Sequence, residues 1–269
     1  MDITGNAVIF GGGAGIGRAT CLALAEAGAR GILIADINLG SAQDVAAEIK
    51  TAATNPGCRA EAIHVDVALE ESVNSVLKQM VHSFGRIDYC VVCAGVAMKY
   101  NRDITNSDVA DFIRVQNINV NGTYFVLRAV LAIMKSQEPR SNFAGSVDRG
   151  VTRGSVITLG SIMSCSVESG TTPYTTSKHA VLGLTKNAAL DSAKHGIRVN
   201  CVCPDWVETG MIKQYALDNP SEEATVSRLG RLGRPEEIAD AIVFLCSPRS
   251  SFVTGCPFIV DGGATLCHK

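Results

Sequence analysis

The chain alternates between two kinds of segment along most of its length. Short runs rich in β-branched and apolar residues are separated by longer stretches in which apolar residues recur three and four positions apart. Strands separated by helices of about ten or more residues run parallel, because each crossover is made by a helix. The sequence therefore predicts an α/β fold, a doubly wound parallel sheet with helices on both faces. The predicted strands are 7–10, 31–35, 60–65, 87–93, 155–159, 198–203 and 258–260.

Composition and charge narrow the class of protein. The 269 residues, 46% of them hydrophobic, suit one sizeable core, so we expect a single domain over residues 1–269. The net charge of −2 provides no broad positive field for nucleic acid or an anionic membrane. The start has no basic leader, and no apolar run approaches the roughly 18 residues that a membrane helix needs. We expect a soluble, unprocessed, cytoplasmic protein.

The cysteines and histidines show no metal-ligand pattern. Ten cysteines lie mostly inside apolar runs, which predicts buried reduced thiols rather than a disulfide scaffold. Cys90 and Cys93 form a C-x-x-C, but residues three apart in a strand point to opposite faces, and no second pair completes a site. The five histidines are scattered. We therefore expect no bound metal.

A glycine-rich turn follows the first predicted strand and precedes a helical run. Residues 11–18 read Gly-Gly-Gly-Ala-Gly-Ile-Gly-Arg. Such a turn lets the backbone approach a pyrophosphate, and the next helix offers free N–H groups and the positive end of its dipole. The P-loop pattern fails because Arg18 and Ala19 stand where Lys and Ser/Thr are needed. The remaining spacing, set by Gly11, Gly15 and Gly17, predicts a dinucleotide site, with a simple flexible turn as the alternative.

An acidic residue ends the second predicted strand. Asp36 lies 19 residues after Gly17, where a carboxylate can accept hydrogen bonds from the adenosine ribose and would repel a 2′-phosphate. No Lys or Arg follows directly in Ile37-Asn38-Leu39. The pattern favours NAD over NADP in a Rossmann-type sheet, while a simple loop carboxylate is the alternative. Asp66, after the third strand, is similarly placed to meet the adenine amino group.

A second group of polar residues predicts acid–base chemistry. Tyr174 and Lys178 are four residues apart and so share one face of a predicted helix. A free tyrosine has a pKa near 10 and is a poor base at neutral pH, but a nearby cation stabilises a phenolate. Ser161, just beyond a strand, can donate to a substrate oxygen beside Tyr174, and Asn119 can support Lys178 through water. A Tyr-x-x-x-Lys spacing alone is common by chance; the serine and the glycine turn make it informative.

These motifs resemble the classical short-chain dehydrogenase/reductase family over essentially the whole chain. The resemblance implies that Tyr174 is the general acid/base, that Ser161 polarises the substrate carbonyl or hydroxyl, and that Lys178 binds the nicotinamide ribose and favours the phenolate. Asn119 would complete the proton relay, and Val207 and Thr209 would line the nicotinamide and phosphate region. The matching segments also include Gly255 and the Asp261-Gly262-Gly263 end. The cofactor-binding residues expected for NAD are Gly11, Gly15, Ile16, Gly17, Asp36, Ile37, Asp66, Val67, Ala94, Gly95, Tyr174, Lys178, Pro204, Val207 and Thr209.

The chain departs from this family at three positions. Phe10 and Cys93 replace a Thr and an Asn whose polar side chains normally tie neighbouring strands together. Asp205 replaces the Gly that usually follows Pro204. We expect Asp205 to point to solvent, with an effect on substrate choice as the alternative.

The substrate should bind beyond the carboxyl ends of the strands, where ligands of parallel sheets sit. The expected pocket residues are mostly apolar, which predicts a fairly apolar small molecule. They are Met163, Cys165, Val167, Trp206, Met211 and Tyr215. Residues 208–230 are predicted to form a lid, with a pair of ordinary surface helices as the alternative.

A polar insertion at 136–154 is rich in Pro, Ser, Gly and Arg. It joins a helix to a strand, so it should emerge at the amino-terminal edge of the sheet, away from the chemistry, as a disordered surface loop. The family resemblance implies a homotetramer or dimer built on the helical stretches 119–134 and 174–193.

The sequence thus predicts an oxidoreductase that transfers a hydride between NAD and a secondary alcohol or ketone. An epimerase or dehydratase of the extended family would usually have a longer carboxyl-terminal region and another glycine spacing. An NAD-binding regulatory or scaffold protein with little turnover is the alternative from another class.

Overall fold

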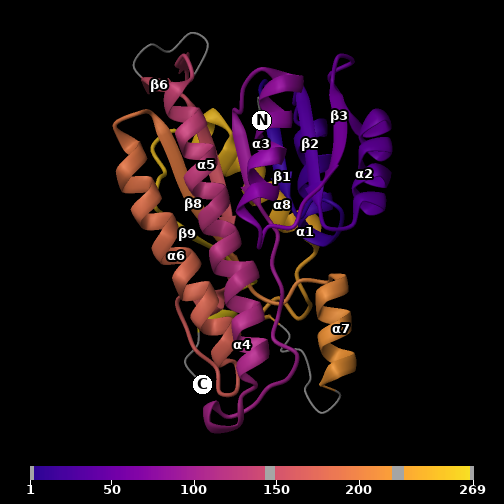
Figure 1. The fold of residues 1–269 in the computed structure, drawn as a ribbon, viewed down its shortest axis with the longest axis vertical. Coiled ribbons are helices and arrows are strands. Elements are labelled where there is room, and N and C mark those ends of the chain that lie inside the picture. Colours follow the sequence, from indigo (N-terminus) through magenta and orange to yellow (C-terminus); the bar gives the residue numbers. More distant parts are fainter. Residues whose placement is uncertain (1–2, 143–148, 220–226, 267–269) are drawn as a thin grey trace.

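Seven parallel strands form the central sheet of the computed structural model (Figure 1). The structure describes residues 3–142, 149–219 and 227–266. The strand order is β3-β2-β1-β4-β7-β8-β9, which confirms the doubly wound sheet. The order reverses between β1 and β4, and this is the point where such sheets open a crevice for ligands. The strands are β1 (Asn6–Phe10), β2 (Gly31–Asp36), β3 (Arg59–His64), β4 (Tyr89–Val92), β7 (Gly154–Leu159), β8 (Ile197–Pro204) and β9 (Pro257–Val260).

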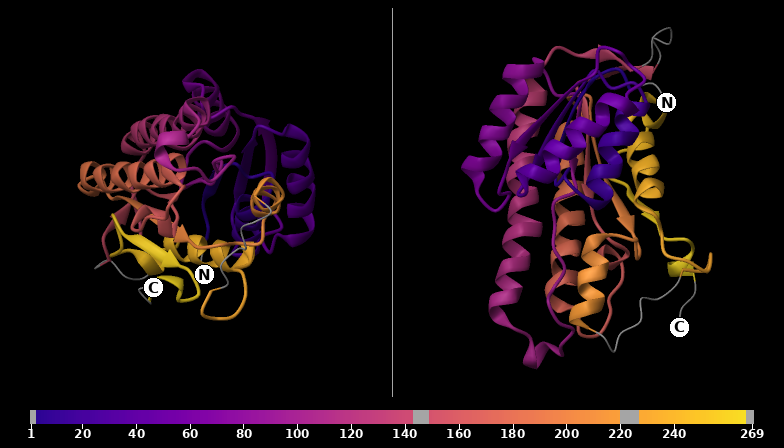
Figure 2. Two further views of the ribbon diagram at one scale, coloured as in Figure 1. Left: turned by 90° about the horizontal axis from the view of Figure 1, so that it is seen from below. Right: turned by 90° about the vertical axis from the view of Figure 1, so that its right-hand side faces the viewer.

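Helices cover both faces of the sheet (Figure 2). One face carries α1 (Gly15–Glu26), α2 (Leu39–Ala52) and α8 (Pro235–Cys246), and the other carries α3 (Glu70–Phe84), α5 (Gly122–Ser136) and α6 (Thr172–Ala193). None of the helices in the described ranges is long and apolar enough to cross a bilayer. The remaining helices and turns are η1 (Ile104–Asn106), α4 (Val109–Val115), η2 (Gln116–Asn121), η4 (Ile162–Ser164), α7 (Gly210–Asp218), η5 (Pro248–Ser250) and η6 (Ala264–Leu266).

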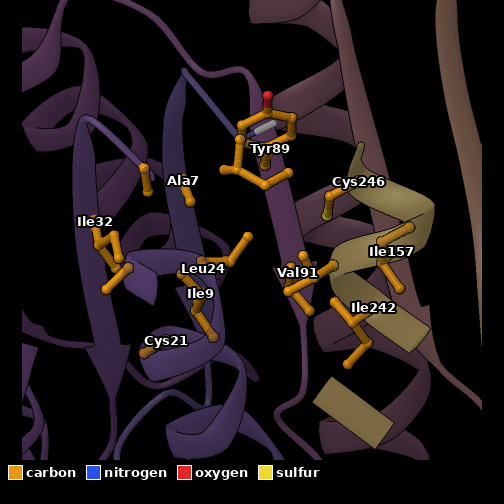
Figure 3. Close-up of a cluster of buried hydrophobic side chains, with 14 of the residues drawn as sticks. Ala7, Ile9, Cys21, Leu24, Ile32, Tyr89, Val91, Ile157, Ile242 and Cys246 are labelled. Carbon is orange, nitrogen blue, oxygen red and sulfur yellow. The ribbon is translucent and has the colours of Figure 1, made fainter. Parts of the chain in front are cut away.

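Two apolar layers hold the sheet in place. Between the sheet and the helices α1 and α8, Ile9, Val91 and Ile157 from three neighbouring strands pack with Leu24 and Ile242 (Figure 3). Every residue of β1 is buried, as expected for a strand covered on both faces. The strands therefore read as apolar runs rather than as alternating patterns.

Local signals explain where several helices begin and end. Asn38 caps α2 by accepting a hydrogen bond from the Ser41 N–H at 3.1 Å. The α3 helix has Glu70 and Glu71 in its first turn, and it ends at Gly85, whose φ of 79° lies in the left-handed region that favours glycine.

Nine cysteines are free thiols in the described residues. Cys90 packs in the layer under α3 and α5, whereas Cys93 packs against the opposite layer, as predicted for a strand. Burial raises the pKa of Cys93 and of Cys246, each to about 12, so both stay neutral thiols. Cys165 differs from the expectation of buried thiols because it is exposed.

Phe10 and Cys93, where the sequence departs from the family, do not separate the strands that they join. The Cys93 N–H donates to the Phe10 carbonyl at 2.8 Å, so the backbone connects β1 to the end of β4.

The polar insertion is more ordered than the sequence predicts. Its two ends pair as an antiparallel hairpin of β5 (Arg140–Ser141) and β6 (Val151–Thr152). The Arg140 guanidinium lies 3.2 Å from the Asp88 carboxylate at the start of β4, so the hairpin is anchored to the sheet. The expectation of a disordered loop is therefore wrong for these ends, and residues 143–148 lie outside the described residues. The hairpin lies at the end of the molecule opposite α7 (Figure 1).

Candidate active site

The glycine turn joins β1 to α1 and faces a cavity of about 600 Å³, here called the glycine-turn cavity. A Cβ on Gly17 would lie 1.9 Å from the Gly11 carbonyl oxygen, so only glycine lets the turn pack on the helix start. Gly15 has φ 51°, and a Cβ there would meet the Thr209 methyl group at 3.2 Å. In the described part of the chain no side chain caps this helix, so its first N–H groups are available to an anion.

Asp36 ends β2 and lines the glycine-turn cavity. Its carboxylate accepts hydrogen bonds from the Gly13 N–H at 2.8 Å and the Asn38 N–H at 2.9 Å. These bonds fix the carboxylate beside the turn and leave lone pairs for further donors. The adjacent Ile37 is 63% exposed and adds an apolar wall.

Three adjoining cavities lead from Asp36 to Trp206. The glycine-turn cavity shares Ile16, Gly95 and Thr209 with a central cavity of about 100 Å³. The central cavity shares Ser161, Tyr174 and Asp205 with a distal cavity of about 90 Å³. Of the predicted residues, the glycine-turn cavity brings together Gly11, Gly15, Ile16, Gly17, Asp36, Ile37, Asp66, Val67, Ala94, Gly95 and Thr209. The central cavity brings together Ser161, Tyr174, Lys178, Pro204, Val207 and Thr209.

Ser161 lies directly beyond β7 and begins the η4 turn. Its Oγ accepts a hydrogen bond from the Met163 N–H at 3.2 Å, and its own N–H donates to Ser164 Oγ at 3.2 Å. This capping box fixes the hydroxyl oxygen at the boundary between the central and distal cavities. The hydroxyl proton remains available to a ligand oxygen.

Tyr174 and Lys178 lie one turn apart near the start of α6, and both line the central cavity. The Lys178 ammonium is 5.4 Å from the centre of the Tyr174 ring and donates to the Leu159 carbonyl at 2.8 Å. Lys178 is 6% exposed. Its charge is thus held beneath the tyrosine, as the four-residue spacing predicts.

Asn119 lies behind the central cavity rather than in its wall. It belongs to the π-helical segment η2, which joins α4 to α5 and includes the first residues of the predicted helical stretch 119–134. Its Oδ1 accepts from the Val96 N–H at 2.8 Å, and its Nδ2 donates to the Val96 carbonyl and to Ser177 Oγ. Both amide protons are therefore used, so any link from this side chain to Lys178 runs through Oδ1. No sequence signal pointed to Ser177 as its partner.

Comparisons with known proteins agree with this geometry. A family model described as Enoyl-(Acyl carrier protein) reductase matches residues 11–265. The short-chain dehydrogenase fogB of Aspergillus ruber is 49% identical over 275 residues, covering 99% of this chain and 98% of that protein. The chain belongs to the classical short-chain dehydrogenase/reductase family. The predicted family resemblance is confirmed.

More distant members of the family have names that specify their chemistry. Cis-4-hydroxycyclohexanecarboxylate dehydrogenase of Sinomonas cyclohexanicum is 35% identical, with 96% of each chain covered. The crystal structure of levodione reductase superposes with a TM-score of 0.87 at 29% identity over 100% of both chains. A 3-ketoacyl-(acyl-carrier-protein) reductase from Brucella melitensis, complexed with NADH, gives a TM-score of 0.82 at 27% identity, covering 98% of this chain and 99% of that one.

The distal cavity of this short-chain dehydrogenase/reductase is mostly apolar. Four predicted pocket residues line it: Met163, Trp206, Met211 and Tyr215. The other two predictions are wrong, because Cys165 and Val167 follow the η4 turn outward and are exposed. Ala97, Met98, Glu168, Thr171 and Ile212 also line the cavity and were not predicted.

The α7 helix closes one side of the distal cavity. Its Tyr215 ring packs on the Trp206 ring with centroids 5.4 Å apart. At the end of the helix, Asn219 Nδ2 donates to the Lys99 carbonyl at 3.2 Å. The predicted lid, residues 208–230, thus begins with a helix that packs against Trp206 and bonds to the Lys99 carbonyl. Residues 220–226 of this segment lie outside the described part.

The prediction that Asp205 points to solvent is wrong. Asp205 lines the central and distal cavities. It directly follows Pro204 at the carboxyl end of β8, so its position at a strand end was the available signal. Burial raises the pKa of the Asp205 carboxyl to about 6, and the carboxylates of Asp261 and Glu168 add to the effect, opposed by a hydrogen bond from the Trp206 backbone.

Neutralising Asp205 should therefore stabilise the protein at neutral pH. The folded chain holds this proton more tightly than the unfolded chain, so the charge begins to destabilise the fold above about pH 4, and the full cost is reached above about pH 6. We expect Asp205→Asn to raise the free energy of unfolding at pH 7.5 by on the order of 1 kcal/mol, allowing for solvent around this half-buried group. Urea unfolding at one protomer concentration should show a clearly smaller gain at pH 4.5. An equal gain at both pH values, or the same gain in the exposed α8 variant Asp240→Asn, would contradict this account.

Proposed function

We propose that the chain is an NAD-dependent oxidoreductase that interconverts a secondary alcohol and its ketone, with Tyr174 moving the proton. One observation carries the proposal: Ser161 and Tyr174 line both the central cavity, which adjoins the glycine-turn cavity, and the distal cavity beyond it. A substrate in the distal cavity would have its oxygen between two hydroxyl groups, next to space for a dinucleotide. Bound NAD would accept or supply the hydride.

The side chains have separate tasks in this proposal. Ser161 donates its hydroxyl proton to the substrate oxygen, while the hydrogen bond from the Met163 N–H to its Oγ fixes the position of the hydroxyl. Tyr174 removes the alcohol proton during oxidation and returns one to the ketone oxygen during reduction. The Lys178 ammonium stabilises the phenolate that forms and contacts the nicotinamide ribose. Asn119 is a positioning residue, because it braces the backbone at Val96 and the α6 helix through Ser177.

The residues around the glycine-turn cavity fit a dinucleotide. The uncapped first turn of α1 suits a pyrophosphate, Asp36 suits the adenosine ribose, and Asp66 suits the adenine amino group. Ile37, Val67, Ala94 and Gly95 would give apolar and backbone contacts along the way. At the nicotinamide end we assign Pro204, Val207 and Thr209, which line the central cavity.

NAD should be used in preference to NADP. Asp36 would repel a 2′-phosphate, and in the part of the chain that the structure describes no basic residue lines the glycine-turn cavity. The arginine that directly follows the glycine turn, Arg18, pairs with Glu48 instead. We expect kcat/KM to favour NAD by at least about tenfold, which is roughly 1.4 kcal/mol.

Asp36→Ala should narrow that preference and weaken NAD binding, because it removes both repulsion and ribose contacts. Adding Ile37→Arg should reverse the preference, since a guanidinium next to the site would pair with a 2′-phosphate. Initial rates with both cofactors measure the ratio, and Asp44→Ala on the exposed side of α2 serves as the matched control. Equal use of both cofactors by the wild type would refute the assignment.

The substrate should be fairly apolar, since Met98, Met163, Trp206 and Met211 dominate the distal cavity. The relative from Sinomonas cyclohexanicum is named for a ring that bears a secondary alcohol and a carboxylate, which supports a secondary alcohol as the reacting group. A panel of cyclic and aryl secondary alcohols with NAD, followed by NADH absorbance, tests the proposal. Absence of turnover with every member and with both cofactors would favour a regulatory protein.

We also propose a homo-oligomer, a tetramer or dimer, built on the helical layer of α4, α5 and α6. Val109, Ile113, Tyr124 and Leu190 of this layer are 47–78% exposed. Light scattering at micromolar concentration should give a multiple of the 28.3 kDa chain. Leu190→Glu should shift the mass toward the monomer, because it adds a charge to an apolar contact. A monomeric wild type would refute this proposal.

A further inference from the structure

Asp205 is a carboxylate at the substrate end of the site that the proposed chemistry does not use. It shares both the central and the distal cavities with Ser161 and Tyr174. A substrate whose reacting oxygen lies between these two hydroxyl groups therefore passes close to a third polar group. The chemistry of this carboxylate indicates which further substrate group it could bind.

The charged residues that the structure describes around the distal cavity are acidic. Among the described residues that line it, Glu168 and Asp205 are charged, and none is Lys, Arg or His. Glu168 is exposed to solvent, whereas Asp205 is half-buried. Within the described ranges, Asp205 takes part in no ion pair. A carboxylate in this position lowers its free energy by accepting a hydrogen bond, and it repels an anion.

We propose that Asp205 is a specificity-determining residue that accepts a hydrogen bond from a second hydroxyl group of a neutral substrate and excludes anionic substrates. This inference rests on the proposed function, since it uses the same cavity. The apolar walls formed by Met163, Trp206 and Met211 would have to desolvate an ammonium group, which costs more than desolvating a hydroxyl. The substrate class is thus an otherwise apolar secondary alcohol or ketone that carries a neutral hydrogen-bond donor.

A matched set of compounds tests this specificity. The set is 1-phenylethanol and its derivatives with a hydroxyl, a methoxy, a carboxylate or an aminomethyl group at the meta position, with the corresponding ketones. Alcohol oxidation gives kcat/KM, and calorimetry with the enzyme loaded with NAD, which cannot reduce a ketone, gives the Kd of each ketone. We expect the wild type to prefer hydroxyl over methoxy by at least tenfold and over carboxylate by at least a hundredfold. Methoxy keeps the oxygen but donates no proton and is one methyl group larger, so the hydrogen bond is reported by the fall of the first ratio from the wild type to Asp205→Leu.

Two variants at the same position separate charge from hydrogen bonding. Asp205→Asn removes the charge but keeps an acceptor oxygen, so it should reduce the discrimination against carboxylate at least tenfold while keeping part of the hydroxyl preference. Asp205→Leu removes both, and the two ratios should fall to within about threefold of unity. Asp240→Asn, an identical change on the exposed surface of α8, should leave both ratios at the wild-type values.

The outcomes are distinguishable from a failure of the proposed function. If no alcohol is oxidised with either cofactor, the oxidoreductase assignment fails, while the ketone Kd ratios still decide the role of Asp205. If alcohols are oxidised but Asp205→Asn and Asp205→Leu keep the wild-type ratios, the inference is wrong and the oxidoreductase assignment stands. Preference for the aminomethyl compound over the hydroxyl compound would also overturn it, because it would identify a cation as the partner of Asp205.

Discussion

Tyr174→Phe should lower kcat at least a thousandfold, about 4 kcal/mol, while the Kd for NADH stays within threefold. The ring of Tyr174 lies in the wall of the central and distal cavities, and phenylalanine keeps that wall. Only the transferable proton is lost. Ser161 cannot replace it, because an unassisted serine hydroxyl is a weak acid and a weak base at neutral pH.

The measurement is steady-state kcat together with NADH binding by fluorescence. Tyr100→Phe is a matched control, since Tyr100 is half exposed and outside the three cavities. A Tyr174→Phe enzyme that keeps more than a tenth of wild-type kcat would show that another group moves the proton. Loss of NADH affinity in that variant would instead indicate a structural role for the hydroxyl.

Lys178→Met should lower kcat/KM by about a thousandfold and also weaken NADH binding, unlike the tyrosine variant. One ammonium is assigned two tasks, the stabilisation of the phenolate and the contact with the nicotinamide ribose. Methionine keeps most of the buried length of the side chain, which lies between α6 and the Leu159 carbonyl. The loss therefore reports the charge rather than an empty space.

Lys186 lies on the exposed side of the same helix, so Lys186→Met should leave both kcat/KM and NADH affinity unchanged. Kinetics and NADH titration on the two variants separate the tasks. A Lys178→Met enzyme with normal NADH affinity would remove the ribose contact from the account, and one with normal kcat would remove the assistance to Tyr174.

The sheet was predictable because its signal is local. Predicted strands 7–10 and 31–35 correspond to β1 (Asn6–Phe10) and β2 (Gly31–Asp36), since strands buried on both faces are continuous apolar runs. The glycine turn and the Tyr174–Lys178 pair were predictable for the same reason, because each follows from spacing within one turn or one helix. Asp36 was predictable from its place at the end of the second strand, 19 residues after Gly17.

The errors concern residues whose direction depends on distant contacts. Asp205 faces the cavities, and the wall around it includes Trp206, which is held by packing on Tyr215 of α7. The polar composition of 136–154 predicted disorder, but Arg140 bonds to Asp88 and Arg153 donates to the His195 carbonyl, and these partners are remote in sequence. The partners of the Asn119 side chain, Val96 and Ser177, are likewise remote in sequence, so periodicity within one helix cannot reveal them.

The most direct test of the account follows the hydride itself. A secondary alcohol labelled with deuterium on its carbinol carbon is incubated with NAD and the wild-type enzyme, and the recovered NADH is analysed by mass spectrometry and NMR. We expect one deuterium at C4 of the nicotinamide for each ketone formed, on a single face of the ring, and almost none with Tyr174→Phe over the same time. Unlabelled NADH, or ketone formed without reduction of NAD, would contradict the assignment of this chain as a hydride-transferring oxidoreductase.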